Sequence, residues 1–453
     1  MDRDTTICAI STPAGVGGIA VARVSGSDAI AVCQKLWHGK NLADLPSHTA
    51  HLGTIDDSNG SPLDQAVATV FRGPNSFTGE AVVEISVHGS RYVQQELLNA
   101  LISTGATLAR PGEFTRRAFA SGKMDLAQAE AVADVIASES RAAHRIAISQ
   151  MRGRFSRRLN DLREKLLELA SLLELELDFS EEEVEFASRA HLREIAEAVQ
   201  HEVRRLAASF RSASAIKDGI PVAIVGATNA GKSSLLNALL GDDRAIVSDI
   251  HGTTRDIVED VLNVGDYRFR IMDTAGLRTT DDKIENLGIE RSLRAAGNAR
   301  IVIVVIDREY PTLPTLPQID SDIIVAINKS DRPSSSDLSA ILSDPKLTKA
   351  HKIEISALEG DGIGDIRDAM QEIARAGEGD ESAVLVTNAR HFEALLQADE
   401  AITRAIDAID SSLSGDLIAM DIRLTIHHLN SILGTITSQD VLNSIFSRFC
   451  IGK

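Results

Sequence analysis

The spacing of apolar and polar residues separates the chain into mixed and purely helical stretches. The first part alternates between the two kinds of pattern and is interrupted by turn-rich loops such as PAGVGG at 13–18. Apolar runs typical of strands occupy residues 7–10, 19–24, 66–71 and 82–87. Helical spacing is found at 29–36 and 92–102. The pattern predicts a mixed α/β unit at the N-terminus.

A helical stretch follows. From about residue 124 to residue 213 the chain is rich in Ala, Leu, Arg and Glu and contains no proline. One apolar stripe recurs at spacings of three and four and requires a partner helix. It consists of Leu162, Leu166, Leu169, Leu172 and Leu173. We therefore expect packed helices rather than a single extended one.

Alternating strand and helix patterns then fill residues 220–374, and helical spacing returns after the polar joint GEGDES at 377–382. Both helical parts would expose apolar stripes if they stood alone, so we expect the α/β unit to be inserted into one helical domain. The predicted domains are an N-terminal domain (1–120), a first helical part (121–215), the inserted α/β domain (216–376) and a second helical part (377–453). We therefore expect a multidomain α/β fold, with an N-terminal α+β domain, a helical domain and an inserted doubly wound domain.

A phosphate-binding motif opens the inserted domain. Residues 226–234 read GATNAGKSS and fit G-x-x-x-x-G-K-[ST] between a strand-like run and a helix-like run. Glycines in such a loop let backbone N–H groups surround phosphates at a helix N-terminus. Lys232 is expected to reach the β- and γ-phosphates, and Ser233 to ligate Mg²⁺.

Two further motifs follow in the order expected of a GTP-hydrolysing switch domain. DTAG at 273–276 ends a predicted strand, so that Asp273 would hold the metal through water and the Gly276 N–H would meet the γ-phosphate. NKSD at 328–331 selects the base, because the Asp331 carboxylate accepts hydrogen bonds from the N1 and N2 donors of guanine. Adenine lacks that pattern, so the three motifs together predict GTP.

Composition narrows the class of protein. The 453 residues suit about three domains, and a formal net charge of −18 argues against a protein coated in nucleic acid. No apolar run approaches the ~20 residues of a membrane span, and MDRDTTICAI does not resemble a signal peptide. Cys8, Cys33 and Cys450 have no metal-ligand spacing. These features predict a cytoplasmic protein that does not associate with membranes.

The charge is unevenly distributed. Residues 141–165 contain eight basic and two acidic residues, a net charge of +6, whereas 168–185 is strongly acidic. A solvated helix with segregated charge is the favoured interpretation, and a local phosphate-binding patch for RNA is the alternative.

Three segments now identify a resemblance. The P-loop with Asn229, the segment IVSDIHGTTRD at 246–256 and the terminus FCIGK at 449–453 together resemble the MnmE (TrmE) family of tRNA modification GTPases. FCIGK is the most specific, because P-loops are shared by many unrelated NTPases. The resemblance extends over the whole chain, including GPNSFTGE at 73–80, ARPGEFTRRAF at 109–119 and KMDLAQAEA at 123–131.

The resemblance implies a reaction. With an FAD- and NADH-dependent flavoprotein of the MnmG (GidA) family, such proteins install a carboxymethylaminomethyl or aminomethyl group on C5 of the wobble uridine of certain tRNAs. The one-carbon unit comes from 5,10-methylene- or 5-formyl-tetrahydrofolate bound by the N-terminal domain. The same resemblance implies a homodimer through that domain, and a heterotetramer or larger assembly with the flavoprotein.

The resemblance also assigns folate contacts. The matching residues are Arg23, Glu80, Lys123 and Lys453. Chemically, a carboxylate such as Glu80 can read the donor–acceptor edge of a pterin bidentately, and a glutamate tail requires cations such as Arg23 or Lys453.

A monovalent cation is a further implication. The resemblance suggests that K⁺ neutralises charge on the β–γ bridge, where many GTPases use an arginine. Its ligands would be Asn229, Ser248, Ile250 and Thr253, while Thr254 would join Ser233 on Mg²⁺. From the residues alone, Asn229 is equally a turn residue that tolerates unusual backbone angles. The downstream sequence GTTRD favours the cation site.

The residues predicted to bind GTP come from the P-loop, the segment after it, the DTAG and NKSD motifs and the loop at 356–358. They are Gly226, Asn229, Ala230, Gly231, Lys232, Ser233, Ser234, Ser248, Asp249, Ile250, His251, Gly252, Thr253, Thr254, Asp273, Thr274, Ala275, Gly276, Asn328, Lys329, Ser330, Asp331, Ser356, Ala357 and Leu358.

Hydrolysis also requires a group that orients water. The residues alone leave Asp281, Asp282, Glu285 and Glu290 as candidates, and alignment to the family motif selects Glu285 as the catalytic residue.

Cys450 has two interpretations. It is either a reactive thiol near the one-carbon site or a small buried hydrophobe, and we favour the structural role.

A P-loop domain flanked by helices is also found in two other classes of GTPase. A regulatory ribosome-assembly GTPase with RNA-binding flanking domains is the main alternative, but it has no use for a folate pocket or for FCIGK. A dynamin-like membrane GTPase is disfavoured because the sequence lacks a basic amphipathic or lipid-anchor segment.

Overall fold

The computed structural model describes residues 5–178, 188–241, 260–272, 294–314, 321–334, 338–378 and 383–452. The chain forms two compact units. The first consists of 1–133, 150–161 and 426–453, and the second of 134–149 and 162–425. The four predicted domain ranges remain predictions. None of the described helices is both long and apolar enough to cross a bilayer.

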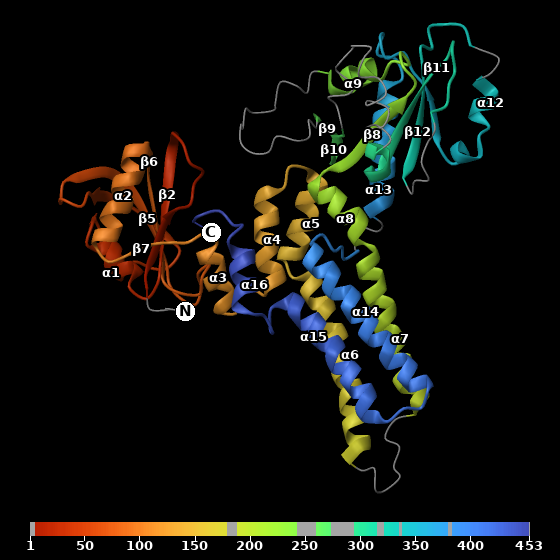
Figure 1. Cartoon of the computed structure of the whole chain (residues 1–453). Helices are drawn as coiled ribbons and strands as arrows, with labels where there is room; N and C mark the ends of the chain where they lie inside the picture. Colours follow the sequence, from red (N-terminus) through yellow and green to blue (C-terminus); the bar gives the residue numbers. More distant parts are fainter. Residues whose placement is uncertain are drawn as a thin grey trace. The chain divides into compact units, whose positions relative to one another are not determined.

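The first unit contains a seven-stranded sheet in the order β3-β4-β5-β6-β2-β1-β7, antiparallel except for β1 and β7 (Figure 1). The strands are β1 (Ile7–Ile10), β2 (Gly17–Ser25), β3 (Trp37–His38), β4 (Thr49–Asp56), β5 (Pro62–Phe71), β6 (Val82–Gly89) and β7 (Thr107–Leu108). Helices α1 (Ala29–Gln34) and α2 (Arg91–Ser103) and the short turn η1 (Leu42–Asp44) complete this part. The four predicted strands and two predicted helices are confirmed. Strand β4 was missed because it buries one side chain, Ile55, and so has no apolar run.

The first unit also contains three shorter helices. They are α3 (Glu113–Ala120), α4 (Leu126–Ala137), of which residues 126–133 belong here, and α16 (Gln439–Phe446). Leu126, Ala129, Phe446 and Phe449 form a small core among them. Gly112 has φ +66°, and a Cβ there would lie 2.7 Å from the Phe446 carbonyl oxygen, so glycine permits this close approach.

The second unit contains a six-stranded sheet in the order β13-β12-β11-β8-β10-β9, parallel except for the β9–β10 hairpin. The strands are β8 (Ile220–Gly226), β9 (Asp260–Val264), β10 (Tyr267–Ile271), β11 (Ile301–Asp307), β12 (Asp322–Asn328) and β13 (His351–Glu354). Among the described residues, the helical segments that lie between these strands or directly follow them are α9 (Lys232–Leu240), α12 (Leu338–Leu342), η4 (Pro345–Leu347) and α13 (Ile363–Glu378).

Strand β11 shows why this sheet has helices on both faces. Its sequence IVIVVID is buried throughout. Ile301 and Ile303 enter the core shared with α9 and α13, whereas Val302 and Val304 enter the core shared with α12. A continuous apolar run is what a central parallel strand covered on both faces requires. The doubly wound α/β class is thereby confirmed.

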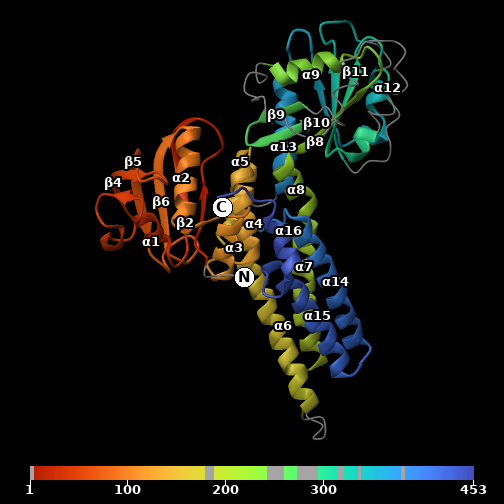
Figure 2. The same cartoon turned by 60° about the vertical axis from the view of Figure 1, so that its left-hand side comes forward.

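The remaining helices of the described part of the chain are mostly amphipathic. They are α5 (Arg141–Met151), α6 (Arg154–Asp178), α7 (Arg189–Ala208), α8 (Phe210–Asp218), α14 (Ala389–Asp410) and α15 (Gly415–Leu433). Helices α7 and α14 lie side by side in both views (Figures 1 and 2). The predicted leucine stripe on α6 is confirmed except at Leu172, which is only partly buried.

Candidate functional sites

The P-loop follows strand β8 and leads directly into helix α9. Gly231 has φ +99° and precedes the first helical residue, while a Cβ at Gly226 would lie 2.5 Å from the Val305 carbonyl oxygen. A side chain at either position would disturb the turn, as expected of a loop whose backbone must approach phosphates. The exposed Asn229 has φ +60°.

Lys232 folds back over its own loop. Its ammonium donates to the carbonyl oxygens of Gly226 at 3.0 Å and Ala227 at 2.8 Å. The adjacent Ser233 and Ser234 are exposed at the start of α9. A cation and two hydroxyls thus lie at the positive end of a helix dipole, which suits a polyphosphate.

Asn328 connects the P-loop to the base-reading loops. Its Nδ2 donates to the Ala230 carbonyl oxygen at 2.8 Å, and its Oδ1 accepts from the Ala357 N–H at 3.0 Å. The Asp331 carboxylate accepts from the Ser356 hydroxyl at 3.0 Å. Five predicted GTP-binding residues are therefore brought together around one buried amide. Of the others nearby, the Ser330 N–H donates to the Ile355 carbonyl oxygen at 3.0 Å, and Leu358 is exposed.

Asp307 is a residue of this site that the sequence analysis missed. It ends β11 opposite Asn328 in the parallel register, and its Oδ2 accepts from the Lys329 ammonium at 2.5 Å. Burial acts to raise the pKa of Asp307. The bonds from Lys329 and from the Glu309 and Tyr310 N–H groups outweigh burial, and the pKa lies below its ordinary value. The sequence feature that could have predicted this role is the position of Asp307 at the carboxyl end of an apolar run, where parallel strands place their site residues.

Several predicted residues lie outside the described part of the chain. They are Ser248, Asp249, Ile250, His251, Gly252, Thr253, Thr254, Asp273, Thr274, Ala275, Gly276, Glu285 and Lys453. The described residues contain no cluster of three His, Cys, Asp or Glu side chains suited to a metal. Of the predicted metal ligands, only Asn229 and Ser233 lie within the described residues.

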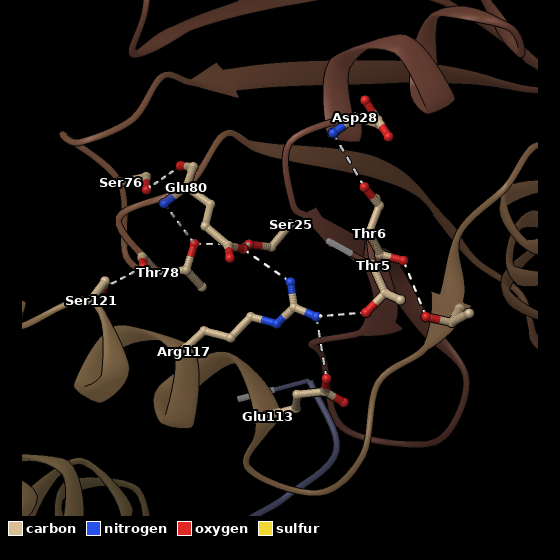
Figure 3. A network of polar contacts seen from close by, with 11 residues as sticks. Thr5, Thr6, Ser25, Asp28, Ser76, Thr78, Glu80, Glu113, Arg117 and Ser121 are labelled. Carbon is tan, nitrogen blue, oxygen red and sulfur yellow. Dashed lines mark hydrogen bonds and ion pairs between the residues drawn. The ribbon is translucent and has the colours of Figure 1, made fainter. Parts of the chain in front are cut away.

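A second polar site lies in the first unit, where the loop before β6 meets helix α3 (Figure 3). The Glu80 Oε2 atom accepts from Arg117 Nη1 at 3.1 Å and from the Ser25 hydroxyl at 3.0 Å. The Thr78 carbonyl oxygen accepts from the Ser121 hydroxyl at 2.7 Å. The loop that carries Glu80 is thus attached to both β2 and α3.

Arg23 lies two residues before Ser25 on the same strand. It forms an ion pair with Glu84 at 2.8 Å, and its guanidinium carbon lies 5.5 Å and 5.7 Å from the ring centroids of Phe77 and Phe114. These contacts leave the arginine stacked against apolar rings, a setting that strengthens its interaction with a further anion.

The C-terminal segment reaches the same strand. The Gly452 carbonyl oxygen accepts from the Ser11 hydroxyl at 3.1 Å and from Arg23 Nη1 at 3.4 Å. The exposed Lys123 lies near the Glu80 loop, since a Cβ at Gly79 would be 3.5 Å from its Cγ. Of the predicted folate contacts, Arg23, Glu80 and Lys123 are therefore found in one region with the residue preceding Lys453.

The favoured interpretation of Cys450 was wrong. Cys450 is exposed, not buried, although the neighbouring Phe449 and Gly452 are buried. The Cys450 carbonyl oxygen accepts from the Gly112 N–H at 3.4 Å. A reactive role stays a prediction. Cys8 and Cys33 are the buried cysteines.

Comparison with known proteins identifies the family of the chain. The family models described as "GTP-binding protein TrmE N-terminus" and "MnmE helical domain" match residues 6–123 and 126–450. The chain is 50% identical to a protein of Parabacteroides distasonis, covering 99% of this chain and all of the relative. It is 47% identical to one of Porphyromonas gingivalis, covering 99% and 98%, and 46% identical to one of Bacteroides thetaiotaomicron, covering both completely. All three relatives are named tRNA modification GTPase MnmE. The resemblance noted in the motifs is confirmed: the chain belongs to the tRNA modification GTPase MnmE family and is a GTP hydrolase.

Proposed function

We propose that the chain is a K⁺-dependent GTPase that modifies C5 of the wobble uridine of certain tRNAs together with an FAD-dependent MnmG partner. The product carries a carboxymethylaminomethyl or aminomethyl group, and the one-carbon unit is supplied by tetrahydrofolate bound in the first unit. The protein acts as a cytoplasmic homodimer that assembles with the flavoprotein.

The arrangement around Asn328 supports GTP as the nucleotide. It joins the P-loop, which suits phosphates, to Asp331, whose carboxylate suits the two donors of guanine. Ser233 at the start of α9 fits a Mg²⁺ ligand, and the metal would neutralise charge on the β- and γ-phosphates. The exposed amide of Asn229 is available to a monovalent cation beside the same phosphates.

One observation carries the folate part of the proposal. The Gly452 carbonyl oxygen contacts Ser11 and Arg23, so the family-specific terminus meets the sheet beside the loop that holds Glu80. Phe77, which is only partly buried, supplies aromatic surface, and Arg23 supplies a cation for a glutamate tail. A ligand with an aromatic ring, a polar edge and carboxylates fits this combination of aromatic, acceptor and cationic side chains.

The way Glu80 is held refines the contact with a pterin. Oε2 already accepts two hydrogen bonds, from Arg117 and Ser25. Each carboxylate oxygen has about two acceptor positions. Recognition of the pterin edge would therefore use Oε1, rather than both oxygens as the chemistry of an isolated carboxylate suggests.

Nucleoside analysis of tRNA tests the proposal. A bacterial strain that lacks its own member of the family is complemented with this chain or with an inactive Lys232→Ala variant, and wobble-uridine modification is measured by mass spectrometry. Restoration by the chain and not by the variant is expected. Unmodified tRNA together with restored ribosome assembly would instead support a ribosome-assembly GTPase.

The cation requirement has its own test. GTP turnover is compared in KCl and NaCl at equal ionic strength, with and without Asn229→Ala. Turnover should be at least about tenfold faster in KCl, as for loss of one charge-stabilising contact worth about 1.4 kcal/mol, and the substitution should abolish the difference. Equal rates for the unsubstituted protein in both salts would exclude the K⁺ site.

A further inference from the structure

Arg117 is a buried arginine to which the sequence analysis gave no role. Its side chain is 8% exposed, although arginine is rarely buried unless it is paired. Nη1 donates to Glu80 Oε2 at 3.1 Å, and Nη2 donates to Glu113 Oε1 at 3.3 Å. One guanidinium therefore meets two carboxylates.

The guanidinium is itself held in place. Glu113 lies one turn before Arg117 in α3, and its other oxygen accepts from the Arg110 N–H at 2.8 Å. Nη2 also donates to the Thr5 hydroxyl at 3.3 Å. Because the guanidinium is planar and rigid, fixing Nη2 also fixes the direction of Nη1 toward Glu80.

Glu80 is fixed through both its backbone and its side chain (Figure 3). Its carbonyl oxygen accepts from the Ser76 hydroxyl at 2.5 Å, and its N–H donates to the Thr78 hydroxyl at 3.3 Å. The Ser25 hydroxyl, which is fully buried, is the second donor to Oε2.

The two oxygens of Glu80 differ. Within the described part of the chain, Oε2 accepts both side-chain hydrogen bonds and Oε1 accepts none. The Glu80 side chain is 23% exposed, so a ligand can reach it, whereas Arg117 is enclosed. The network thus fixes the carboxylate while leaving one of its oxygens available.

We propose that Arg117 is a positioning residue for ligand recognition by Glu80. Arg117 holds Oε2 so that Oε1 is presented to the donor-bearing edge of a nitrogen heterocycle, the pterin of tetrahydrofolate. This inference rests on the proposed folate function of the site. Holding the acceptor in place beforehand lowers the entropy lost on binding, and the carboxylate would rotate more freely without Arg117.

A double-mutant cycle tests this role. The affinity for 5-formyl-tetrahydrofolate is measured by calorimetry for the unsubstituted protein, Arg117→Met, Glu80→Gln and the double variant. Arg117→Met should weaken binding about tenfold, typical of losing a charge-assisted hydrogen bond. In the Glu80→Gln background the same change should have little further effect, because the carboxylate that it positions is absent.

Controls separate positioning from general stability. Arg91→Met changes an exposed arginine at the start of α2 and should leave affinity unchanged. Arg117→Lys keeps the positive charge but loses the planar guanidinium with its two donating nitrogens. Its affinity should lie between those of Arg117→Met and the unsubstituted protein. If Arg117→Met lowers the melting temperature enough to prevent measurement, Ser25→Ala removes the other donor to Oε2. It should weaken binding about threefold, and only when Glu80 is present.

The outcomes distinguish this inference from the proposed function. Failure of the unsubstituted protein to bind the folate would reject both. Binding that is weakened by Glu80→Gln but not by Arg117→Met or Ser25→Ala would reject the positioning role alone. Equal losses from Arg117→Met in both backgrounds would show that Arg117 only stabilises the fold, and binding insensitive to Glu80→Gln would remove the residue that Arg117 is proposed to position.

Discussion

Asn328 shows what one side chain does in the nucleotide site. A primary amide carries both a donor and an acceptor, and Asn328 uses the first on Ala230 and the second on Ala357. The residue is 3% exposed, so an unpaired group there would be costly. A carboxylate has no donor and would lose the bond to Ala230. The asparagine of the NKSD motif is therefore required by loop assembly as well as by its place in the motif.

The ion pair of Asp307 and Lys329 predicts a pH-dependent stability. The pKa of Asp307 lies below its ordinary value, so its contribution is complete above about pH 4, the ordinary range of aspartate, and is lost as the pH falls through the folded-state pKa. Asp307→Asn should lower the free energy of unfolding by about 2 kcal/mol at pH 7, and this difference should shrink below pH 4. Urea unfolding at several pH values measures it.

Asp322→Asn is the matched control, because Asp322 pairs with Arg300 at the opposite end of the neighbouring strand and is 44% exposed. It should change stability by less than about 1 kcal/mol. An Asp307→Asn effect that stays constant from pH 7 down to pH 3 would contradict the proposed ionic origin.

The cysteines predict a labelling pattern. Burial raises the pKa of Cys8 to about 11 and raises the pKa of Cys33 further, while Cys450 is exposed. Because the thiolate is the reactive form, a thiol reagent at pH 7.5 should modify Cys450 rapidly and the other two only after denaturation. Mass spectrometry of labelled peptides checks this, with Cys450→Ser as control. Rapid labelling of Cys33 in the native protein would contradict the buried position.

At the scale of elements, α5, the β9–β10 hairpin and α13 are connected by polar contacts within the second unit. Arg145 Nη2 donates to both Glu378 oxygens, at 2.7 and 2.5 Å, and the Tyr267 hydroxyl donates to Glu378 at 3.0 Å. The Ala142 N–H donates to the Asp266 carbonyl oxygen at 3.0 Å. Part of the basic run at 141–165 is thus occupied by carboxylates of the same chain. The alternative interpretation of this run as an RNA-binding patch would therefore rely on the arginines beyond Arg145.

Tyr267 predicts how this connection responds to alkali. Burial, with the hydrogen bond to Glu378 and the charge of Glu378, raises the pKa of Tyr267 to about 12. A raised folded-state pKa means that the contribution is complete below pH ~10 and is lost between about pH 10 and 12. Tyr267→Phe should lower stability by about 1 kcal/mol at pH 8.

The difference between Tyr267→Phe and the unsubstituted protein should then close as the pH rises above 10, when measured by denaturant midpoints. Tyr310→Phe, at a residue that is 72% exposed, should leave the profile unchanged. If the stability difference between the two proteins stays constant up to pH 11.5, the protonated hydroxyl of Tyr267 does not stabilise the fold.

At the scale of the whole molecule, the chain ends beside the sheet with which it begins. A Cβ at Gly452, which has φ +96°, would lie 2.5 Å from the Ile10 carbonyl oxygen. The packing of β1 against the last residues is thus specific to glycine. The first unit combines residues 1–133 with 150–161 and with 426–453.

Removal of residues 450–453 tests whether folate binding depends on the first unit and GTP hydrolysis on the second. Folate binding and tRNA modification should be lost, because Gly452 no longer contacts Ser11 and Arg23. GTP turnover should remain within about twofold, since the P-loop and NKSD contacts lie in the second unit. Calorimetry with 5-formyl-tetrahydrofolate and a GTPase assay decide it, with Lys453→Ala as a milder control. Loss of hydrolysis with normal folate binding would show that the two activities are divided differently.

The sequence by itself determined the class of fold, the three nucleotide motifs and the family. Such features are local: apolar periodicity specifies strands and helices, as at β1 and β11, and a phosphate loop is defined by consecutive residues such as Gly226 to Ser234. Strand β4 escaped prediction because its burial is set by its neighbours rather than by its own apolar content.

Only the tertiary structure decided which side chains meet. Arg117 and Glu80 are 37 residues apart, Lys329 and Asp307 are 22 apart, and Ser11 and Gly452 are 441 apart. The exposure of Cys450 belongs to the same category. An ion pair or a buried hydrogen bond depends on the distance between two groups and on the exclusion of water. Neither can be deduced from the spacing of residues along a chain.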